Sequence, residues 1–249
     1  MIREMRKTRN VLIAVALGVA LLPATFALPR DADVSVADVM GNVTLVEGNS
    51  ARAKDASQVV VWLVPAGGAA DRSANRLLPR AHYRMLQHDK TFEPKLLVVP
   101  LGGVVDFPNL DPWFHNVFSL YQGKRFDLGL YQAGAVKAVT FDRPGPSFLF
   151  CNIHPHMTAV ILTVDSDLFG VSNRAGHVVI PHVPEGPYSV HVWYENAASE
   201  STDPSQRGIV VGPGENLLPP ISVSVARHDA SHKDKYGQDY DPKASSPAY

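Results

Sequence analysis

The sequence predicts an all-β protein, and three observations support this prediction. Short runs rich in β-branched and aromatic residues recur along the chain between Gly, Pro, Asn or Asp, which is typical of strands and turns. The 249 residues include 18 glycines and 20 prolines, which favour frequent turns. No segment shows the apolar period of an amphipathic helix. The length allows one or two domains, at about 100–200 residues each.

The N-terminal segment has the pattern of a secretory signal peptide over residues 1–27. Four basic residues are followed by an apolar run of 12 residues, 11–22, and by Thr-Phe-Ala ending at Ala27. A retained membrane anchor is the alternative, although a bilayer span needs about 20 apolar residues. We therefore expect a periplasmic or secreted protein with no membrane span after cleavage. Its mature charge would be −4, from 19 basic and 23 acidic residues.

The expected strands form two sets along the mature chain. Residues 65–80, rich in Ala, Gly and Arg, are expected to be a linker or long loop, and residues 227–249 a disordered tail. Turns are expected at 173–176 and 184–187. The first set of strands is 34–46, 59–64, 96–99, 104–107, 136–141, 148–150 and 159–164, and the second set is 177–180, 188–194, 208–211 and 221–225.

Charge and cysteine content exclude some functions. The whole chain has 23 basic and 24 acidic residues and no basic stripe, which argues against nucleic-acid binding. Cys151 is the only cysteine, so no internal disulfide can form. In an oxidising compartment a lone thiol is at risk of oxidation unless it is buried or bound to a metal.

Two short segments carry residues suited to a metal site. Residues 113–119 read Trp-Phe-His-Asn-Val-Phe-Ser, and residues 151–157 read Cys-Asn-Ile-His-Pro-His-Met. A thiolate, two imidazoles and a thioether are the ligand set of a blue-copper site, because soft ligands suit Cu(I) while imidazole also suits Cu(II). Two other readings remain open. Cys151 could be a small buried apolar residue, or the site could hold zinc, for which Met is a poor ligand.

The two segments resemble the cupredoxins, the blue-copper protein family, over about residues 83–165. The spacing Cys-x2-His-x2-Met, with Pro155 directly after the first His, is similar to the short copper loop of the amicyanins. Secreted bacterial cupredoxin-domain proteins labelled methylamine utilisation share Phe-Pro-Asn before the first ligand and Cys-Asn-Ile-His at the loop. The matching run is Phe92-Glu93-Pro94, residues 96–100, Gly102-Gly103, residues 104–108, Asn109, Asp111 and His115-Asn116-Val117.

This resemblance implies one type 1 copper ion. His115, Cys151 and His154 would be the equatorial ligands and Met157 the axial one. Asn116 would brace the Cys loop by hydrogen bonds, and the amide of Asn152 would point at the sulfur. His156 departs from the pattern, because related proteins often have an aromatic residue there. It would be a competing ligand or, if exposed, a gate for electrons.

The flanking segments resemble a second β-sandwich. Gly41-Asn42-Val43 and residues 59–65 look like the first strands of the carboxypeptidase regulatory-like, transthyretin-like domain, also grouped as a carbohydrate-binding-like fold. Its continuation resembles residues 173–194. The expected organisation is therefore a cupredoxin domain, 80–165, inserted between two parts, 34–65 and 166–226, of a host sandwich that contacts a glycan or a protein. A single extended sandwich is the alternative.

These expectations favour a secreted one-electron carrier with a transient redox partner protein. Four protein ligands leave no open position for substrate, which argues against an enzyme. Trp113 and Phe114 would either form an exposed docking patch or pack inside. The alternatives are a copper carrier, sensor or cell-surface binding module without electron transfer, and a metal-free interaction protein.

Overall fold

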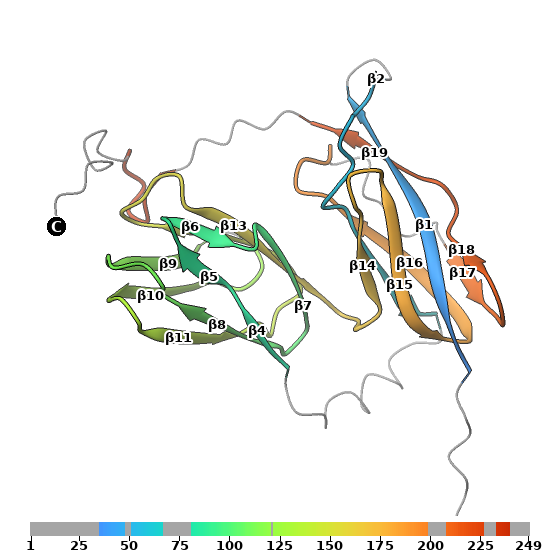
Figure 1. Cartoon of the computed structure of the whole chain (residues 1–249), viewed down its shortest axis with the longest axis horizontal. Coiled ribbons are helices and arrows are strands. Elements are labelled where there is room, and N and C mark those ends of the chain that lie inside the picture. The colour runs from blue at the N-terminus through green and yellow to red at the C-terminus, as the bar shows by residue number, and fades with distance from the viewer. Residues whose placement is uncertain are drawn as a thin grey trace, which may run out of the picture. The chain divides into compact units, whose positions relative to one another are not determined.

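The computed structural model of the chain describes residues 35–47, 51–66, 81–120, 122–198, 208–226 and 233–239. The described residues all belong to one compact unit. The expected signal peptide, residues 1–27, lies outside the described residues, as does most of the linker expected at 65–80. The described residues form strands joined by turns and bends, which confirms the all-β class (Figure 1). Within them no helix has the length and hydropathy to cross a membrane.

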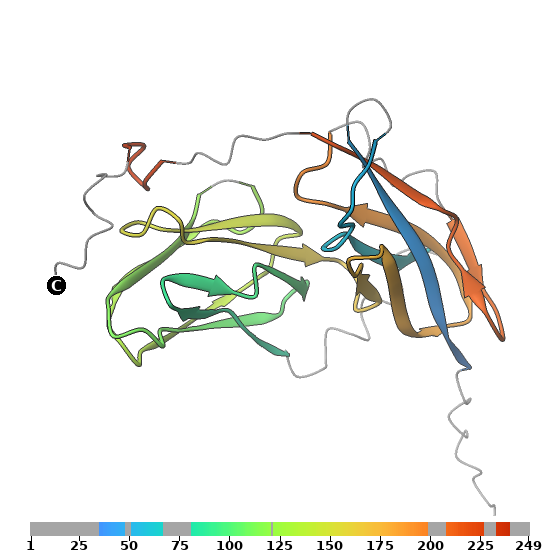
Figure 2. The same ribbon diagram turned by 45° about the horizontal axis from the view of Figure 1, so that its top comes forward.

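The N-terminal and C-terminal strands build one β-sandwich. In one sheet β1 pairs with β15, β18, β19 and β2, and in the other the order is β14-β3-β16-β17. Both ribbon views show β1 running along β15 and β19 (Figures 1 and 2). The bounds are β1 Val36–Glu47, β2 Ala51–Arg52, β3 Val60–Pro65, β14 Phe169–Val171, β15 His177–Pro184, β16 Gly186–Trp193, β17 Gly208–Val211, β18 Asn216–Leu217 and β19 Ile221–Val225.

Alternation of side chains explains the core of this first sandwich. In β1, Val39, Val43 and Leu45 are buried while their neighbours are partly or fully exposed, because successive side chains of a strand point to opposite faces. These residues pack with alternating residues of β3, β15, β16 and β19 in one apolar cluster. The buried members of the cluster come from residues before 64 and after 177, so this sandwich has a core of its own.

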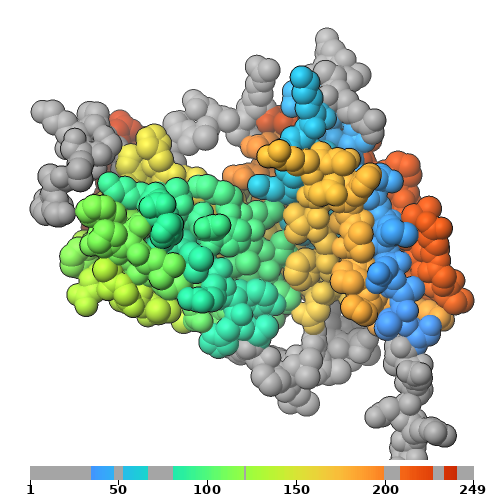
Figure 3. All heavy atoms as spheres, viewed as in Figure 1, coloured from blue at the N-terminus to red at the C-terminus, as the bar shows by residue number. Residues whose placement is uncertain are grey.

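The middle of the chain builds a second β-sandwich. One sheet has the order β10-β9-β12-β13-β7, a second has β11-β8-β4, and β5 and β6 form a hairpin. In the space-filling view, residues of β4 to β8 make up much of its visible face (Figure 3). The bounds are β4 His82–Arg84, β5 Leu86–His88, β6 Thr91–Glu93, β7 Leu96–Pro100, β8 Val104–Pro108, β9 His115–Ser119, β10 Phe126–Tyr131, β11 Val136–Thr140, β12 Gly145–Cys151 and β13 Thr158–Val164.

The core of the second sandwich reaches the segment with the candidate ligands. Phe92, Phe107 and Phe141 are fully buried and pack in one apolar cluster with Cys151 and Met157. Cys151 and Met157, the two candidate ligands that contain sulfur, are therefore part of the close-packed interior. Close packing limits how far such side chains can shift.

The chain leaves the first sandwich after β3 and returns to it at β14. These two strands pair antiparallel, with Trp62 opposite Phe169. Val60 of β3 also packs with Val98, Leu162 and Val164 in a third, smaller apolar cluster. In the sequence, the second sandwich therefore lies between β3 and β14, two paired strands of the first sandwich.

Gly176 supports a stability prediction for the first sandwich. Its φ is +85°, and a Cβ there would lie 2.1 Å from the carbonyl oxygen of Val43. We expect Gly176→Ala to lower the free energy of unfolding by at least about 3 kcal/mol, from left-handed backbone strain plus the clash. Gly214→Ala is the matched control, because its φ is +95° but nothing lies within 4 Å of a Cβ. It should lose only about 1 kcal/mol. Equal losses in urea unfolding would contradict the role of the close contact.

Candidate metal centre

Strand pairing brings the two ligand segments together. His115 is the first residue of β9 and Cys151 the last residue of β12, and β12 pairs with β9 so that Cys151 lies opposite Val117. The loop 152–157 then carries His154 and leads into β13. A short turn holds this loop, because the Met157 N–H donates to the His154 carbonyl (3.0 Å) and the Cys151 N–H to the Met157 carbonyl (3.2 Å).

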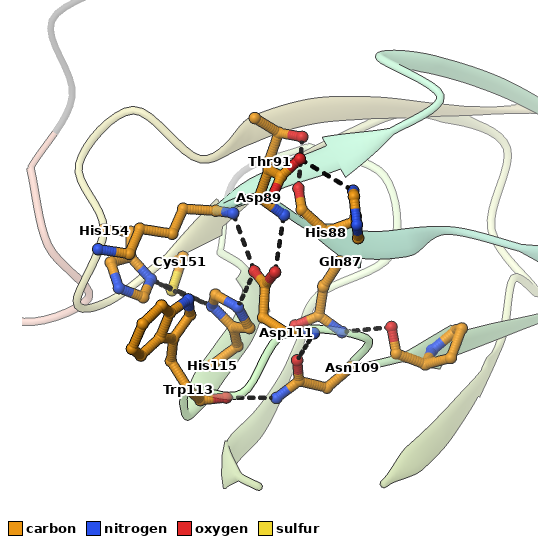
Figure 4. Close-up of polar contacts among 12 residues, drawn as sticks. Gln87, His88, Asp89, Thr91, Asn109, Asp111, Trp113, His115, Cys151 and His154 are labelled. Atoms are coloured by element: carbon orange, nitrogen blue, oxygen red, sulfur yellow. Dashed lines mark hydrogen bonds and ion pairs between the residues drawn. The ribbon is translucent and has the colours of Figure 1, made fainter. Parts of the chain in front are cut away.

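Three of the predicted ligands converge in the structure (Figure 4). The Nδ1 atoms of His115 and His154 are 3.1 Å apart, and they lie 3.9 Å and 3.6 Å from the Cys151 sulfur. His115 and Cys151 are fully buried, and His154 is half-buried. Among the residues that the structure describes, this is the one group of three or more His, Cys, Asp or Glu side chains with converging donor atoms.

The spacing of these donors fits a single metal ion. Nitrogen and sulfur ligands bind such ions at about 2.0–2.3 Å, which in a trigonal plane separates the donors by about 3.5–3.7 Å. The observed 3.1–3.9 Å brackets this range. One thiolate and two imidazoles are also the chemical set that copper prefers. The donor set and its spacing therefore fit copper.

The electrostatics of the site favour neutral imidazoles, the form that binds metals. Burial lowers the pKa of His154 to about 4, with a further contribution from the charges of His115 and Lys90. Burial also lowers the pKa of His115, although the neighbouring Asp111 carboxylate opposes the effect. Both rings are therefore uncharged near neutral pH.

For the thiol of Cys151, in contrast, burial disfavours the form that binds metals, the thiolate. Burial raises its pKa, although the backbone N–H groups of Asn116, Ile153 and His154 face the sulfur and lower it in part. A buried cation at the site would offset this cost, because a coordinating thiol is deprotonated. The three backbone N–H groups are already oriented to stabilise the thiolate.

Met157 is fully buried and belongs to the same apolar cluster as Cys151. It lies at the end of the loop, where its backbone bonds to both Cys151 and His154. Its role as an axial thioether stays a prediction.

Asn116 and Asn152 each make a contact that the sequence did not indicate. The Asn116 side chain donates to Asp127 of β10 (2.7 Å), while its backbone N–H faces the Cys151 sulfur. The side-chain oxygen of Asn152 accepts from the Lys235 N–H (3.1 Å). His156 is exposed, which is the condition under which the sequence predicted an electron gate.

Asp111 is the site residue that sequence reasoning did not assign. Its carboxylate accepts from the Nε2 atom of His115 at 2.8 Å, and the side chains of the two residues are 4% and 0% exposed. The available signal was its position four residues before a candidate ligand in the matched Asn109 to His115 run. Acidic residues are common at such turns, so the pattern alone did not indicate this contact.

A turn in the C-terminal tail contacts loop 152–157, whereas the sequence predicted a disordered tail over residues 227–249. Residues 233–239 of the tail are described, and Lys235 reaches both segments of the site. Its ammonium pairs with Asp127 (2.9 Å), while its N–H donates to Asn152. Asp127 in turn holds Asn116, so the residues that directly follow His115 and Cys151 are both tied to this turn.

This contact predicts an effect on the metal-free thiol. We expect Lys235→Ala to speed alkylation of Cys151 in the metal-free protein by about two- to fivefold, because losing about 0.5–1 kcal/mol from a partly exposed pair raises local opening by that factor. Arg174→Ala, which removes an exposed ion pair with Asp55, is the control and should leave the rate unchanged. A Lys235→Ala rate equal to wild type would show that the turn does not restrain the loop.

Trp113 and Phe114 lie directly before His115 and are 36% and 54% exposed. The Lys90 ammonium lies 5.2 Å from the centre of the Trp113 ring. Trp113 and Phe114 were expected either to be exposed or to pack inside, and the structure favours exposure. Figure 4 draws Trp113 among the residues of the site.

No family model matches the sequence, and no curated protein matches it. Among solved structures, the chain is similar to the copper-containing nitrite reductase of Thermus scotoductus SA-01, with 25% identity and a TM-score of 0.34. That match covers 42% of this chain and 25% of the reductase.

Two smaller copper-protein structures are also similar to parts of the chain. A purple cupredoxin from Nitrosopumilus maritimus is 20% identical over 33% of this chain and 99% of its own, with a TM-score of 0.30. Amicyanin from Paracoccus versutus is 18% identical over 36% of this chain and 87% of its own, with a TM-score of 0.29. With TM-scores near 0.3 these partial likenesses carry no argument, and the ligand assignment rests on the geometry of the site.

Proposed function

We propose that this chain is a secreted type 1 copper protein that carries one electron at a time to or from a transient protein partner. The observation that supports it is the convergence of two imidazole Nδ1 atoms on one buried thiol, 3.1–3.9 Å apart. His115, Cys151 and His154 would hold one copper ion, with Met157 as a weak axial ligand. When bound, the copper ion supplies a one-electron couple between Cu(I) and Cu(II).

The chain's own residues set the conditions for electron transfer. His115 and Cys151 belong to paired strands, so their positions change little with the charge of the site. Backbone N–H groups stabilise the thiolate, and the aromatic core around it excludes water. Such a rigid, dry environment keeps the rearrangement between oxidation states small.

The surface next to the site suits a short-lived encounter with a partner protein. His154 is half-buried, and Trp113 and Phe114 are exposed beside the ligand segment. Exposed aromatic residues mark protein contact surfaces. His154, or the exposed His156, would be the point where electrons leave.

The finer assignments belong to the same proposal. We infer an amicyanin-like copper loop, a periplasmic or secreted location, and no enzymatic activity, since four protein ligands leave no open position. The first sandwich would be a carboxypeptidase regulatory-like domain that contacts a glycan or a protein. Copper handling without electron transfer is the competing function, and the exposed His156 in the loop favours it, because it offers a further imidazole for exchange.

Absorption and EPR spectra of the purified protein after copper addition test the proposal, together with metal content and cyclic voltammetry. We expect one copper per chain, an intense thiolate-to-copper band, narrow copper hyperfine splitting and a reversible one-electron wave. Copper that binds without this band, or that exchanges rapidly with a chelator, would favour copper handling instead. A His156→Phe variant separates the two functions, since it should preserve the spectrum and slow exchange only in a carrier.

A further inference from the structure

Asp111 lies behind a ligand of the site rather than in it (Figure 4). Its Oδ2 atom is 2.8 Å from the Nε2 atom of His115, the ring nitrogen opposite the one that faces Cys151. Because a carboxylate only accepts hydrogen bonds, Nε2 must carry the proton. The Nδ1 lone pair is then left to point at the thiol and at His154.

The hairpin between β5 and β6 is shaped to hold this carboxylate. Its two turn residues, Asp89 and Lys90, have φ values of +50° and +54°, a conformation that glycine and asparagine usually supply. Each donates its backbone N–H to Asp111, to Oδ1 at 2.7 Å and to Oδ2 at 2.8 Å. Left-handed backbone at non-glycine residues costs about 1–3 kcal/mol each and persists where the surroundings enforce it.

The result is a carboxylate that is buried and fully hydrogen-bonded. Asp111 also donates its own N–H to Asn109 (3.0 Å), which fixes the loop that carries it. Hydrogen bonds from the Lys90 and Asp89 N–H groups and from the His115 ring stabilise the charged form of this carboxylate. The nearby cation, Lys90, places its ammonium over the Trp113 ring.

We propose, on the basis of the copper function above, that Asp111 is a positioning residue that commits His115 to Nδ1 ligation and stabilises the oxidised ion over the reduced one. The reason is charge balance. Cu(II), the thiolate and Asp111 sum to zero, whereas Cu(I) with the same two anions leaves one negative charge in a low-dielectric interior. Reduction adds one electron from the partner and is therefore opposed by Asp111.

The charge of Asp111 is tested by the reduction potential and by Cu(I) affinity, measured by spectroelectrochemistry and by competition with a chromophoric Cu(I) chelator. We expect Asp111→Asn to lower the ratio of Cu(II) to Cu(I) affinity at least tenfold, which for a one-electron couple raises the potential by about 59 mV. Lys90→Met removes a nearby cation and should shift the ratio in the opposite direction. Asp142→Asn removes an equal charge at an exposed pair with Lys124 and should change the ratio less than twofold.

The positioning role is tested in the metal-free protein, by comparing wild type with one variant. We expect the ¹⁵N shifts of the His115 ring to show a protonated Nε2 and an unprotonated Nδ1, and Asp111→Leu to lose this preference. A wild-type ring protonated on Nδ1 would overturn the positioning role. Equal effects of Asp111→Asn and Asp142→Asn on the ratio would overturn the charge effect.

Two further outcomes are distinguishable. If wild type binds no copper through the thiolate, the proposed function fails while the ring protonation still tests the contact with Asp111. If Asp111→Asn does not fold, because an amide NH₂ then faces a turn N–H, Asp111→Ser replaces it, since its small side chain leaves room for water. Asp111→Ser should show the same tenfold fall in the ratio of Cu(II) to Cu(I) affinity. A ratio equal to that of wild type would overturn the charge effect.

Discussion

Replacing Cys151 by serine is expected to abolish the visible colour of the copper-loaded protein completely. The colour of a type 1 site comes from charge transfer between thiolate and copper, and Cys151 is the only cysteine of the chain. No other residue can replace it. The loss should occur without unfolding, because the substitution changes one buried atom and a hydroxyl there costs about 1–3 kcal/mol. Absorption spectroscopy and circular dichroism on the same sample check both parts.

Met157→Leu is the matched variant, since it removes the other buried sulfur of the site at similar volume. We expect it to keep the colour, because the equatorial ligands remain, and to raise the potential, because a lost axial donor favours Cu(I). Colour that survives in Cys151→Ser, or disappears in Met157→Leu, would contradict the ligand assignment.

Excising the second sandwich is expected to leave a folded first sandwich. The apolar core of the first sandwich contains no residue of 82–164. Trp62 lies opposite Phe169 in the antiparallel pair of β3 and β14, so continuing this register places residue 66 opposite 165. A two-residue turn such as Asn-Gly can therefore join Ala66 to Asp165, because adjacent strands lie about 5 Å apart. Asp165 is kept, since it accepts from the Trp62 indole (3.1 Å).

The shortened chain should unfold cooperatively in urea and show dispersed amide resonances. It should be less stable than the full chain, because Val60 and its neighbours lose their contacts with Leu162 and Val164. A larger excision, residues 59–165, is the control. It removes β3, which pairs with both β14 and β16, and should leave no cooperative transition. A disordered product from the smaller excision would favour a single extended sandwich.

Most strands could be predicted from local pattern alone. Residues 104–107 and 159–164 were expected as strands and lie within β8 and β13, and the strand expected at 188–194 overlaps β16 except for its last residue. The short strands β4, β5 and β6 were missed, because three residues give no readable alternation. The pairing of residues 145–151 with residues 115–119 could not be predicted either, because the two strands are distant in the sequence.

The ligand segments were predictable for a different reason. Cys151, His154 and Met157 lie within one loop, so their spacing is visible in the sequence. His115 was found through its neighbours Asn116 and Val117. In contrast, the contacts of Asn116 were not predicted, because Asp127 is on another strand and the tail that holds Asp127 is more than a hundred residues away.

The sequence by itself determined the all-β class, the absence of an internal disulfide and the chemical identity of the candidate ligands, because each follows from composition or from short-range spacing. Only the tertiary structure decided which ring nitrogens face the thiol and which carboxylate lies behind His115. The physical reason is that a buried group is stabilised by partners that folding brings to it from elsewhere in the chain. The Asp89 and Lys90 backbone, held in a left-handed turn against Asp111, is such a partner.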